Sequence, residues 1–217
     1  MKQNLTELVF ILDKSGSMTG LEKDTIGGFN SMLEKQKKVD GECRVTTVLF
    51  DNRYELLHDR IDLQAVQPLT EKDYETGGST ALLDAIGRTI HKIGTAQRHT
   101  ADAYRAAHVL FVIITDGEEN SSREYTSRKV KEMIERQKSK YGWEFVFLGA
   151  NIDAVATAEE FGIGQECAAD YVADGEGTEL NFRVMSDAVM KFRAEGCFSG
   201  ASLDRIRKDR KKRGGRH

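Results

Sequence analysis

Four short apolar stretches are the clearest pattern along the chain. Each has five or six residues, is rich in Val, Phe and Ile, and is nearly continuous rather than alternating with polar residues. Continuous runs are typical of strands covered on both faces, because a strand with one face in water alternates apolar and polar positions. We therefore predict buried strands at residues 8–12, 45–50, 109–114 and 145–149.

Between and after these strands, apolar residues recur every three or four positions, which is the spacing of an amphipathic helix. Thr19 with Glu22, and Ser121 with Glu124, match the capping-box pattern and predict helix starts nearby. The helical segments that the spacing predicts cover residues 26–33, 82–93, 130–134 and 184–192.

Strand alternating with helix predicts an α/β fold with a doubly wound, mainly parallel sheet and helices on both faces. After the second strand, Asp51-Asn52-Arg53 is a turn signal, and the strand-like residues 54–63 follow it. We expect this segment to run antiparallel at the sheet edge. A further short strand is expected near residues 169–172, which gives six strands in one domain.

Composition is that of an ordinary folded domain. The chain has 217 residues, of which 39% are hydrophobic and 31% charged. A chain of this length buries about 70% of its unfolded surface, so its core needs no metal or disulfide. Cys43, Cys167 and Cys197 are widely spaced, which favours reduced thiols and a cytoplasmic location. The apolar run at residues 8–12 is too short for a signal peptide or a membrane span, so we expect no membrane association.

Charge is distributed unevenly along the chain. Residues 204–217 hold eight Lys or Arg and two Asp, whereas the rest of the chain is acidic. We place the domain at residues 1–203 and expect residues 204–217 to form a disordered basic tail, because so few apolar residues cannot offset the entropy of ordering. The basic tail could make a weak contact with nucleic acid. The acidic remainder of the chain would repel the phosphates.

Oxygen-bearing side chains gather where three of the predicted segments meet the sheet edge. Asp13, Ser15 and Ser17 alternate directly after the first strand, Thr80 follows a Gly-Gly-Ser sequence before the second helix, and Asp116 follows the third strand. Open α/β sheets bind ligands beyond the carboxyl ends of their strands. Each residue alone could be a helix cap or a turn residue, but the combination favours a ligand site.

The pattern Asp13-x-Ser15-x-Ser17, then Thr80, then Asp116 resembles the metal-ion-dependent adhesion site of von Willebrand factor type A domains. The order and spacing fit along residues 5–192, and the sequences at 115–120 and 147–151 resemble small bacterial members of the family. The resemblance implies a Rossmann-like fold. It also implies that Ser15, Ser17 and Thr80 coordinate a divalent cation, while Asp13 and Asp116 act directly or through waters.

The donor set suits Mg²⁺ or Mn²⁺, which prefer oxygen ligands. Neutral hydroxyls leave such an ion short of negative charge, so it would attract an outside carboxylate. We therefore expect a protein-binding module that binds an Asp or Glu of a partner through the cation. The sequence does not identify the partner or the oligomeric state.

Two other functions stay open. An Asp after the first strand together with Mg²⁺ also describes phosphotransferases and hydrolases, but those place a second Asp where this chain has Ser15. No zinc-hydrolase or P-loop motif is present, so we expect no catalytic residue. The second is the nucleic-acid contact of the tail. Around the site, we expect Lys14 and Met18 on the rim and residues 118–120 in a solvated turn.

Overall fold

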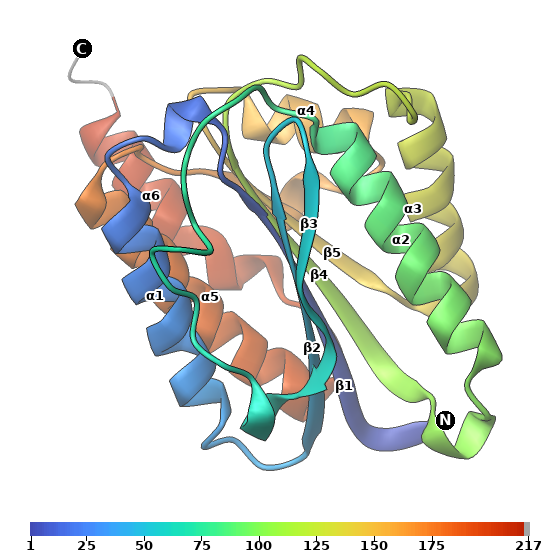
Figure 1. Ribbon diagram of the computed structural model, residues 1–217. Helices are drawn as coiled ribbons and strands as arrows, with labels where there is room; N and C mark the ends of the chain where they lie inside the picture. Colours follow the sequence, from blue (N-terminus) through green and yellow to red (C-terminus); the bar gives the residue numbers. More distant parts are fainter. Residues whose placement is uncertain (215–217) are drawn as a thin grey trace.

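The computed structural model describes residues 1–214 and has a central six-stranded sheet between two layers of helices (Figure 1). The strand order is β3-β2-β1-β4-β5-β6. The strands are β1 (Lys2–Asp13), β2 (Glu42–Phe50), β3 (Tyr54–Asp62), β4 (Ala106–Asp116), β5 (Glu144–Ala150) and β6 (Ala168–Asp170). The helices are α1 (Glu22–Gln36), α2 (Leu82–His99), α3 (Ser127–Tyr141), α4 (Ala154–Glu160), α5 (Gly175–Glu195) and α6 (Asp204–Arg213).

The predicted topology is confirmed. β1 lies in the middle of the sheet and pairs in parallel with both β2 and β4. β3 is the one antiparallel strand among the described residues and lies at the edge beside β2. Strand order reverses between β1 and β4, because the chain builds the sheet outward in one direction from β1 and in the other from β4. Ligand sites of doubly wound sheets lie at such a point.

Side chains of β1 enter two separate cores, which explains why its sequence does not alternate apolar with polar residues. Leu8, Phe10 and Leu12 face the core under α1, α5 and α6, whereas Val9 and Ile11 face the core under α2, α3 and α4. All five are at most 1% exposed. Figure 1 shows the same division, with the two groups of helices on opposite faces of the sheet.

The helix start predicted near Thr19 and Glu22 is confirmed, but neither capping box forms. Helix α1 begins at Glu22, and its N-cap residue, Leu21, makes no side-chain hydrogen bond. The carboxylate of Glu22 instead accepts from the amide of Gly20 and the hydroxyl of Thr76. Helix α3 begins six residues after Ser121 and is capped by Thr126, which accepts from the amide of Lys129. Helix α4 has seven residues, too few for the periodic pattern to predict it.

The expectation of a disordered tail is wrong for residues 204–213, which form α6. Ile206 is 1% exposed and packs into the core beneath α5. The guanidinium of Arg207 donates to the carbonyls of Gly200, Glu166 and Ala168. Arg213 pairs with Asp174 at the start of α5. One apolar anchor and two arginines with fixed acceptors therefore hold the helix. Residues 215–217 lie outside the described part.

Within residues 1–214, no helix is both long enough and apolar enough to cross a bilayer.

Candidate metal site

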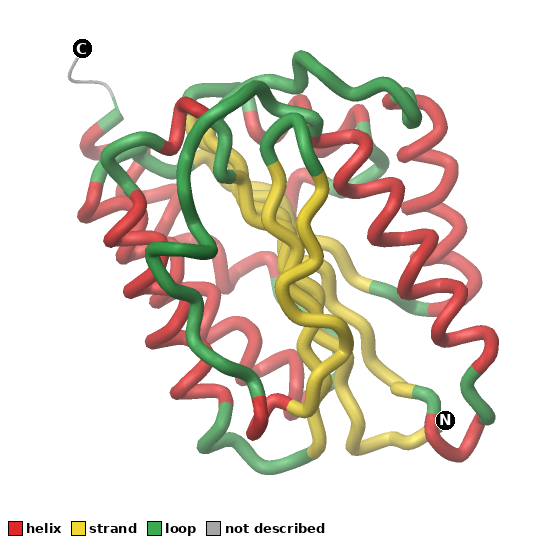
Figure 2. Tube along the Cα trace, viewed as in Figure 1, coloured by secondary structure: helices red, strands yellow, loops and turns green. Residues whose placement is uncertain are grey.

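The candidate site lies at the carboxyl ends of β1 and β4, the two central strands. Asp13 is the last residue of β1 and Asp116 the last residue of β4. The loops that follow these strands meet the loop that precedes α2 along one edge of the sheet (Figure 2). The carboxyl ends of β1 and β4 lie side by side where the strand order reverses. The topology thus brings together residues about 100 positions apart in sequence.

The first loop turns sharply after β1. The Asp13 carboxylate accepts the amide of Ser15 at 2.7 Å, and residues Gly16–Met18 form one turn of 3₁₀ helix. This turn places the hydroxyl oxygens of Ser15 and Ser17 3.1 Å apart. The alternation of oxygen-bearing side chains in the sequence thus becomes a pair of neighbouring oxygens beside a carboxylate.

Hydrogen bonds hold the loop before α2 between the loop after β1 and the loop after β4. The amide of Gly16 donates to the carbonyl of Gly78 at 3.1 Å, and the amide of Gly77 donates to the carbonyl of Lys14 at 2.9 Å. On the other side, Thr80 exchanges two hydrogen bonds with Asn120. Its amide donates to the Asn120 side chain at 2.9 Å, and its carbonyl accepts from the Asn120 amide at 3.0 Å.

Gly117 lies between the hydroxyls of the two neighbouring loops. A Cβ at this position would be 3.2 Å from Oγ of Ser17 and 3.7 Å from Oγ1 of Thr80, and the residue has φ +156°. Gly117 directly follows Asp116. The structure therefore brings all five predicted residues to one place, with Ser17 and Thr80 close to the end of β4.

Two carboxylates lie buried at the base of this group. Asp13 and Asp116 are each 1% exposed. Asp13 accepts the Thr115 hydroxyl at 2.7 Å and the Asp116 amide at 3.3 Å, while Asp116 accepts from the side-chain amide of Asn151. Burial raises the pKa of both carboxyl groups, and the negative charge of Asp13 raises the pKa of Asp116 further.

Neither carboxylate forms an ion pair within residues 1–214. Lys14, which directly follows Asp13 in sequence, pairs with Glu55 instead. Two buried carboxylates without a basic partner make the site electronegative, and a cation would offset this charge.

The geometry of the hydroxyls fits a small divalent ion. Adjacent oxygen ligands of Mg²⁺, each bound at about 2.0–2.1 Å, lie about 2.9 Å apart in an octahedron. The Ser15 and Ser17 hydroxyls are 3.1 Å apart. Residues 1–214 hold no cluster of three or more His, Cys, Asp or Glu side chains placed to bind a metal. A cation here would thus depend on hydroxyl oxygens in addition to the two carboxylates.

Sequence reasoning missed the residues that support the site. Tyr74, Thr115 and Asn151 donate to Asp13 or Asp116, and Asn120 holds Thr80. Thr115 and Asn151 left a signal that could have been used, because each is a polar residue at the end of a buried strand, as Asp13 is. Tyr74 and Asn120 lie in loops, and no local pattern indicates their contacts with the site.

Three expectations about the rim are corrected. Lys14 is 6% exposed and Met18 is 2% exposed, so neither lies on the rim. Lys14 is turned away to Glu55, and Met18 packs into the core on the side of α1. Glu119 does not stand in a solvated turn, because its carboxylate accepts the amide of Leu83 at 2.9 Å at the start of α2.

The profile of the von Willebrand factor type A domain family matches residues 7–179 of the chain. Three solved structures illustrate the similarity of fold. A von Willebrand factor type A protein from Catenulispora acidiphila has a TM-score of 0.56 at 15% identity, covering 87% of this chain and 43% of that chain. The PilB minor pilin from Streptococcus sanguinis has a TM-score of 0.59 at 12% identity, covering 88% and 62%.

The third structure is proximal thread matrix protein 1 from the mussel byssus, solved with a zinc-occupied MIDAS motif, that is, a metal-ion-dependent adhesion site. It has a TM-score of 0.57 at 11% identity, covering 88% of this chain and 47% of that chain. The chain thus spans less than two thirds of the length of each of these proteins. No curated protein matches the chain by sequence.

Proposed function

The chain belongs to the von Willebrand factor type A domain family, and on that premise we propose that it is a metal-dependent protein-binding module. In this proposal a divalent cation is held by Ser15, Ser17 and Thr80, with Asp13 and Asp116 directly or through water. The ligand is an Asp or Glu side chain of a partner protein.

One observation carries the proposal: two buried carboxylates with no basic partner among residues 1–214 lie beside two loops that present hydroxyl oxygens. A bound cation would supply positive charge and a coordination position open to an outside carboxylate. The chain's own residues orient the ligands. Asp13 fixes the turn that carries Ser15, and Asn120 fixes the main chain of Thr80.

Mg²⁺ or Mn²⁺ is proposed as the ion, on the chemistry of the donors. Hydroxyl and carboxylate oxygens are hard ligands, and no Cys or His is among the five residues. The mussel protein with zinc in its motif supports a divalent cation without deciding which one. Melting curves with each of the three ions at equal concentration would rank them.

The test is capture of partners from a cytosolic extract in Mg²⁺ and in EDTA, with the wild type and Thr80→Ala. Thr80 is 3% exposed, and its main-chain bonds to Asn120 do not need its hydroxyl. We expect the variant to fold and to lose the Mg²⁺-dependent proteins. Thr95→Ala, on the helix α2 away from the site, is the matched control.

Capture that is indifferent to EDTA would remove the metal from the mechanism. Turnover of a phosphoester by the purified protein, dependent on Mg²⁺ and lost in Asp13→Asn, would replace the binding function with catalysis. Ser15 argues against that outcome, since it lacks the carboxylate that acid–base catalysis would use.

The nucleic-acid contact of the basic tail loses support, because Arg207 and Arg213 are bound to the body of the protein. A reducing compartment such as the cytoplasm stays part of the proposal, since Cys43, Cys167 and Cys197 are all free thiols. Burial raises the pKa of the Cys43 thiol to about 12, which makes it unreactive.

A further inference from the structure

A polar cavity of about 280 Å³ opens beside the candidate metal site. It is lined by three segments: the turn between β2 and β3, the loop before α2 with the first turns of that helix, and the loop after β4. Ser79, in its wall, directly precedes Thr80, and the amide of Ser121 donates to the carbonyl of Thr80 at 3.2 Å. The cavity and the metal site therefore share a wall.

The acidic side chains of the cavity are already engaged. Asp84 accepts the amides of Arg123, Glu124 and Tyr125, each at 2.9 Å. The Glu124 carboxylate is held by both guanidinium contacts of Arg88. These two carboxylates thus have their hydrogen-bond donors and do not compete for a further cation.

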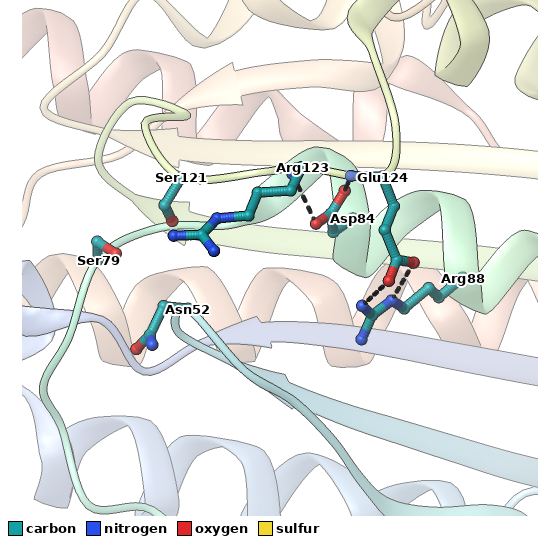
Figure 3. A pocket seen from close by; sticks show the side chains of 7 residues that line it. All are labelled: Asn52, Ser79, Asp84, Arg88, Ser121, Arg123 and Glu124. Atoms are coloured by element: carbon teal, nitrogen blue, oxygen red, sulfur yellow. Dashed lines mark hydrogen bonds and ion pairs between the residues drawn. The ribbon is translucent and has the colours of Figure 1, made fainter.

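Donors in the cavity, in contrast, are free. Within residues 1–214, the guanidinium of Arg123 forms no ion pair or hydrogen bond, while the hydroxyl of Ser121 is buried without a partner. Figure 3 shows the Arg123 side chain extending toward Ser121 and Ser79, with Asn52 on the opposite wall. A guanidinium, two hydroxyls and an amide thus surround one space.

Charge decides which anion fits. Arg88 pairs with Glu124, and Asp84 accepts main-chain amides, so among residues 1–214 Arg123 is the charged side chain of the lining that has no partner. One negative charge would pair with this guanidinium, whereas a phosphate dianion would bring a second negative charge that has no basic partner in the cavity. The planar fork of Arg also matches a carboxylate with two parallel hydrogen bonds.

We propose that this cavity binds a second carboxylate of the same partner, next to the one that the metal binds, with Arg123 as the residue that recognises it. The inference rests on the proposed metal-dependent function and specifies its partner. In an extended segment, side chains two residues apart share a face and lie about 7 Å apart. The partner motif would then be two acidic residues separated by one.

The test uses synthetic peptides and ¹⁵N-labelled protein in Mg²⁺. One capped peptide, Gly-Ser-Glu-Gly-Ser-Gly, carries a single carboxylate, and the other, Gly-Ser-Glu-Gly-Glu-Gly, carries two. Amide shifts of Gly16, Gly78 and Gly117 report on the metal site, and those of Ser79 and Ser121 report on the cavity. We expect the second peptide to bind about fivefold more tightly, the upper range for an exposed ion pair.

Arg123→Ala should abolish this difference and leave the affinity for the single-carboxylate peptide unchanged. The main-chain bond of residue 123 to Asp84 does not depend on the side chain, so the variant should fold. Arg128→Ala, at another exposed arginine outside the cavity, is the matched control and should bind as the wild type does.

Equal affinity for the two peptides, or an advantage that survives Arg123→Ala, would overturn the inference while leaving the metal function in place. Binding of the second peptide that needs Arg123 but not Mg²⁺ would support the cavity as a carboxylate site and overturn the metal function. Peptides that shift none of the reporter amides would overturn both.

Discussion

The hydroxyl of Tyr74 donates a hydrogen bond to the main-chain carbonyl of Asp13, the residue at which β1 ends and the candidate metal loop begins. Tyr74 is 1% exposed, and burial raises the pKa of its phenol, so it is a permanent donor. The long segment between β3 and α2 is thereby fastened beneath the site.

Tyr74→Phe should lower the free energy of unfolding by about 1–3 kcal/mol, because the buried Asp13 carbonyl loses its side-chain donor. Urea denaturation measures this change. Tyr141→Phe, at a tyrosine that is 48% exposed, should have no effect and serves as the control. The same loss in both variants would contradict an anchoring role for Tyr74.

Asp116→Asn should abolish the rise in melting temperature that Mg²⁺ causes, without unfolding the protein. Removing one of two buried, like-charged groups relieves repulsion with Asp13, so the metal-free variant should melt no lower than the wild type. For the wild type, Mg²⁺ at 100 times its dissociation constant stabilises by about 2.7 kcal/mol, or about 5–10 °C for a chain of this size. Calorimetry with and without Mg²⁺ gives both quantities. A variant that keeps the full shift would exclude Asp116 from the site.

Asp84→Asn should destabilise the protein by about 1–3 kcal/mol at pH 7, since the carboxylate accepts three main-chain amides of the loop after β4. Burial alone would raise the pKa of Asp84, but these amides and the charge of Arg88 outweigh it and hold the pKa below its usual value.

The pH dependence of this difference follows from the depressed pKa. Stabilisation by Asp84 is fully present above the pKa of the unfolded chain, near 3.8, and is lost as pH falls through the lower folded-state pKa. The difference in unfolding free energy between wild type and Asp84→Asn should thus be constant from pH 5 to pH 7 and shrink below about pH 4. Denaturation curves at several pH values measure it, and a difference that grows with acid would refute the account.

Arg207→Ala should detach α6, because four carbonyls of the body lose this donor at once. We expect a loss of about 1–3 kcal/mol and faster tryptic cleavage within residues 204–213. Lys211→Ala changes an exposed residue of the same helix and should alter neither stability nor the cleavage rate at the remaining sites. Equal cleavage rates in the Arg207 variant would mean that Ile206 and Arg213 hold the helix without Arg207.

Sequence predicted the sheet and the two aspartates of the site for the same physical reason. A strand covered on both faces is a continuous apolar run, so the position where the run stops is visible, and Asp13 and Asp116 stand at such positions. The roles of Ser15, Ser17 and Thr80 are implied by the resemblance to the family motif rather than by the strand pattern. The contact of Tyr74 could not be predicted in this way, since Tyr74 lies in a loop 61 residues from Asp13 and no local pattern links the two.

The errors have a common origin in tertiary contacts. The capping-box pattern considers only residues near the helix end. Glu22 instead accepts a hydrogen bond from the hydroxyl of Thr76, which is far away in sequence. Ser121 lies in the wall of a cavity rather than at a helix end. The basic tail has few apolar residues, yet Ile206 reaches the core and carbonyls left without partners attract Arg207. Amino-acid composition gives the number of charged side chains but does not show which hydrogen-bond acceptors they contact in the folded protein.

The hydrogen bond from Thr115 to Asp13 joins residues 102 positions apart, and it forms across two adjacent central strands. The cation site therefore cannot exist until β1 and β4 are paired, and we expect this pairing late in folding, because it closes a loop of about 100 residues. Mg²⁺ should accordingly slow the unfolding of the protein and leave its refolding rate unchanged, because the site is not yet formed in the transition state. A bound cation would thus stabilise the centre of the sheet kinetically.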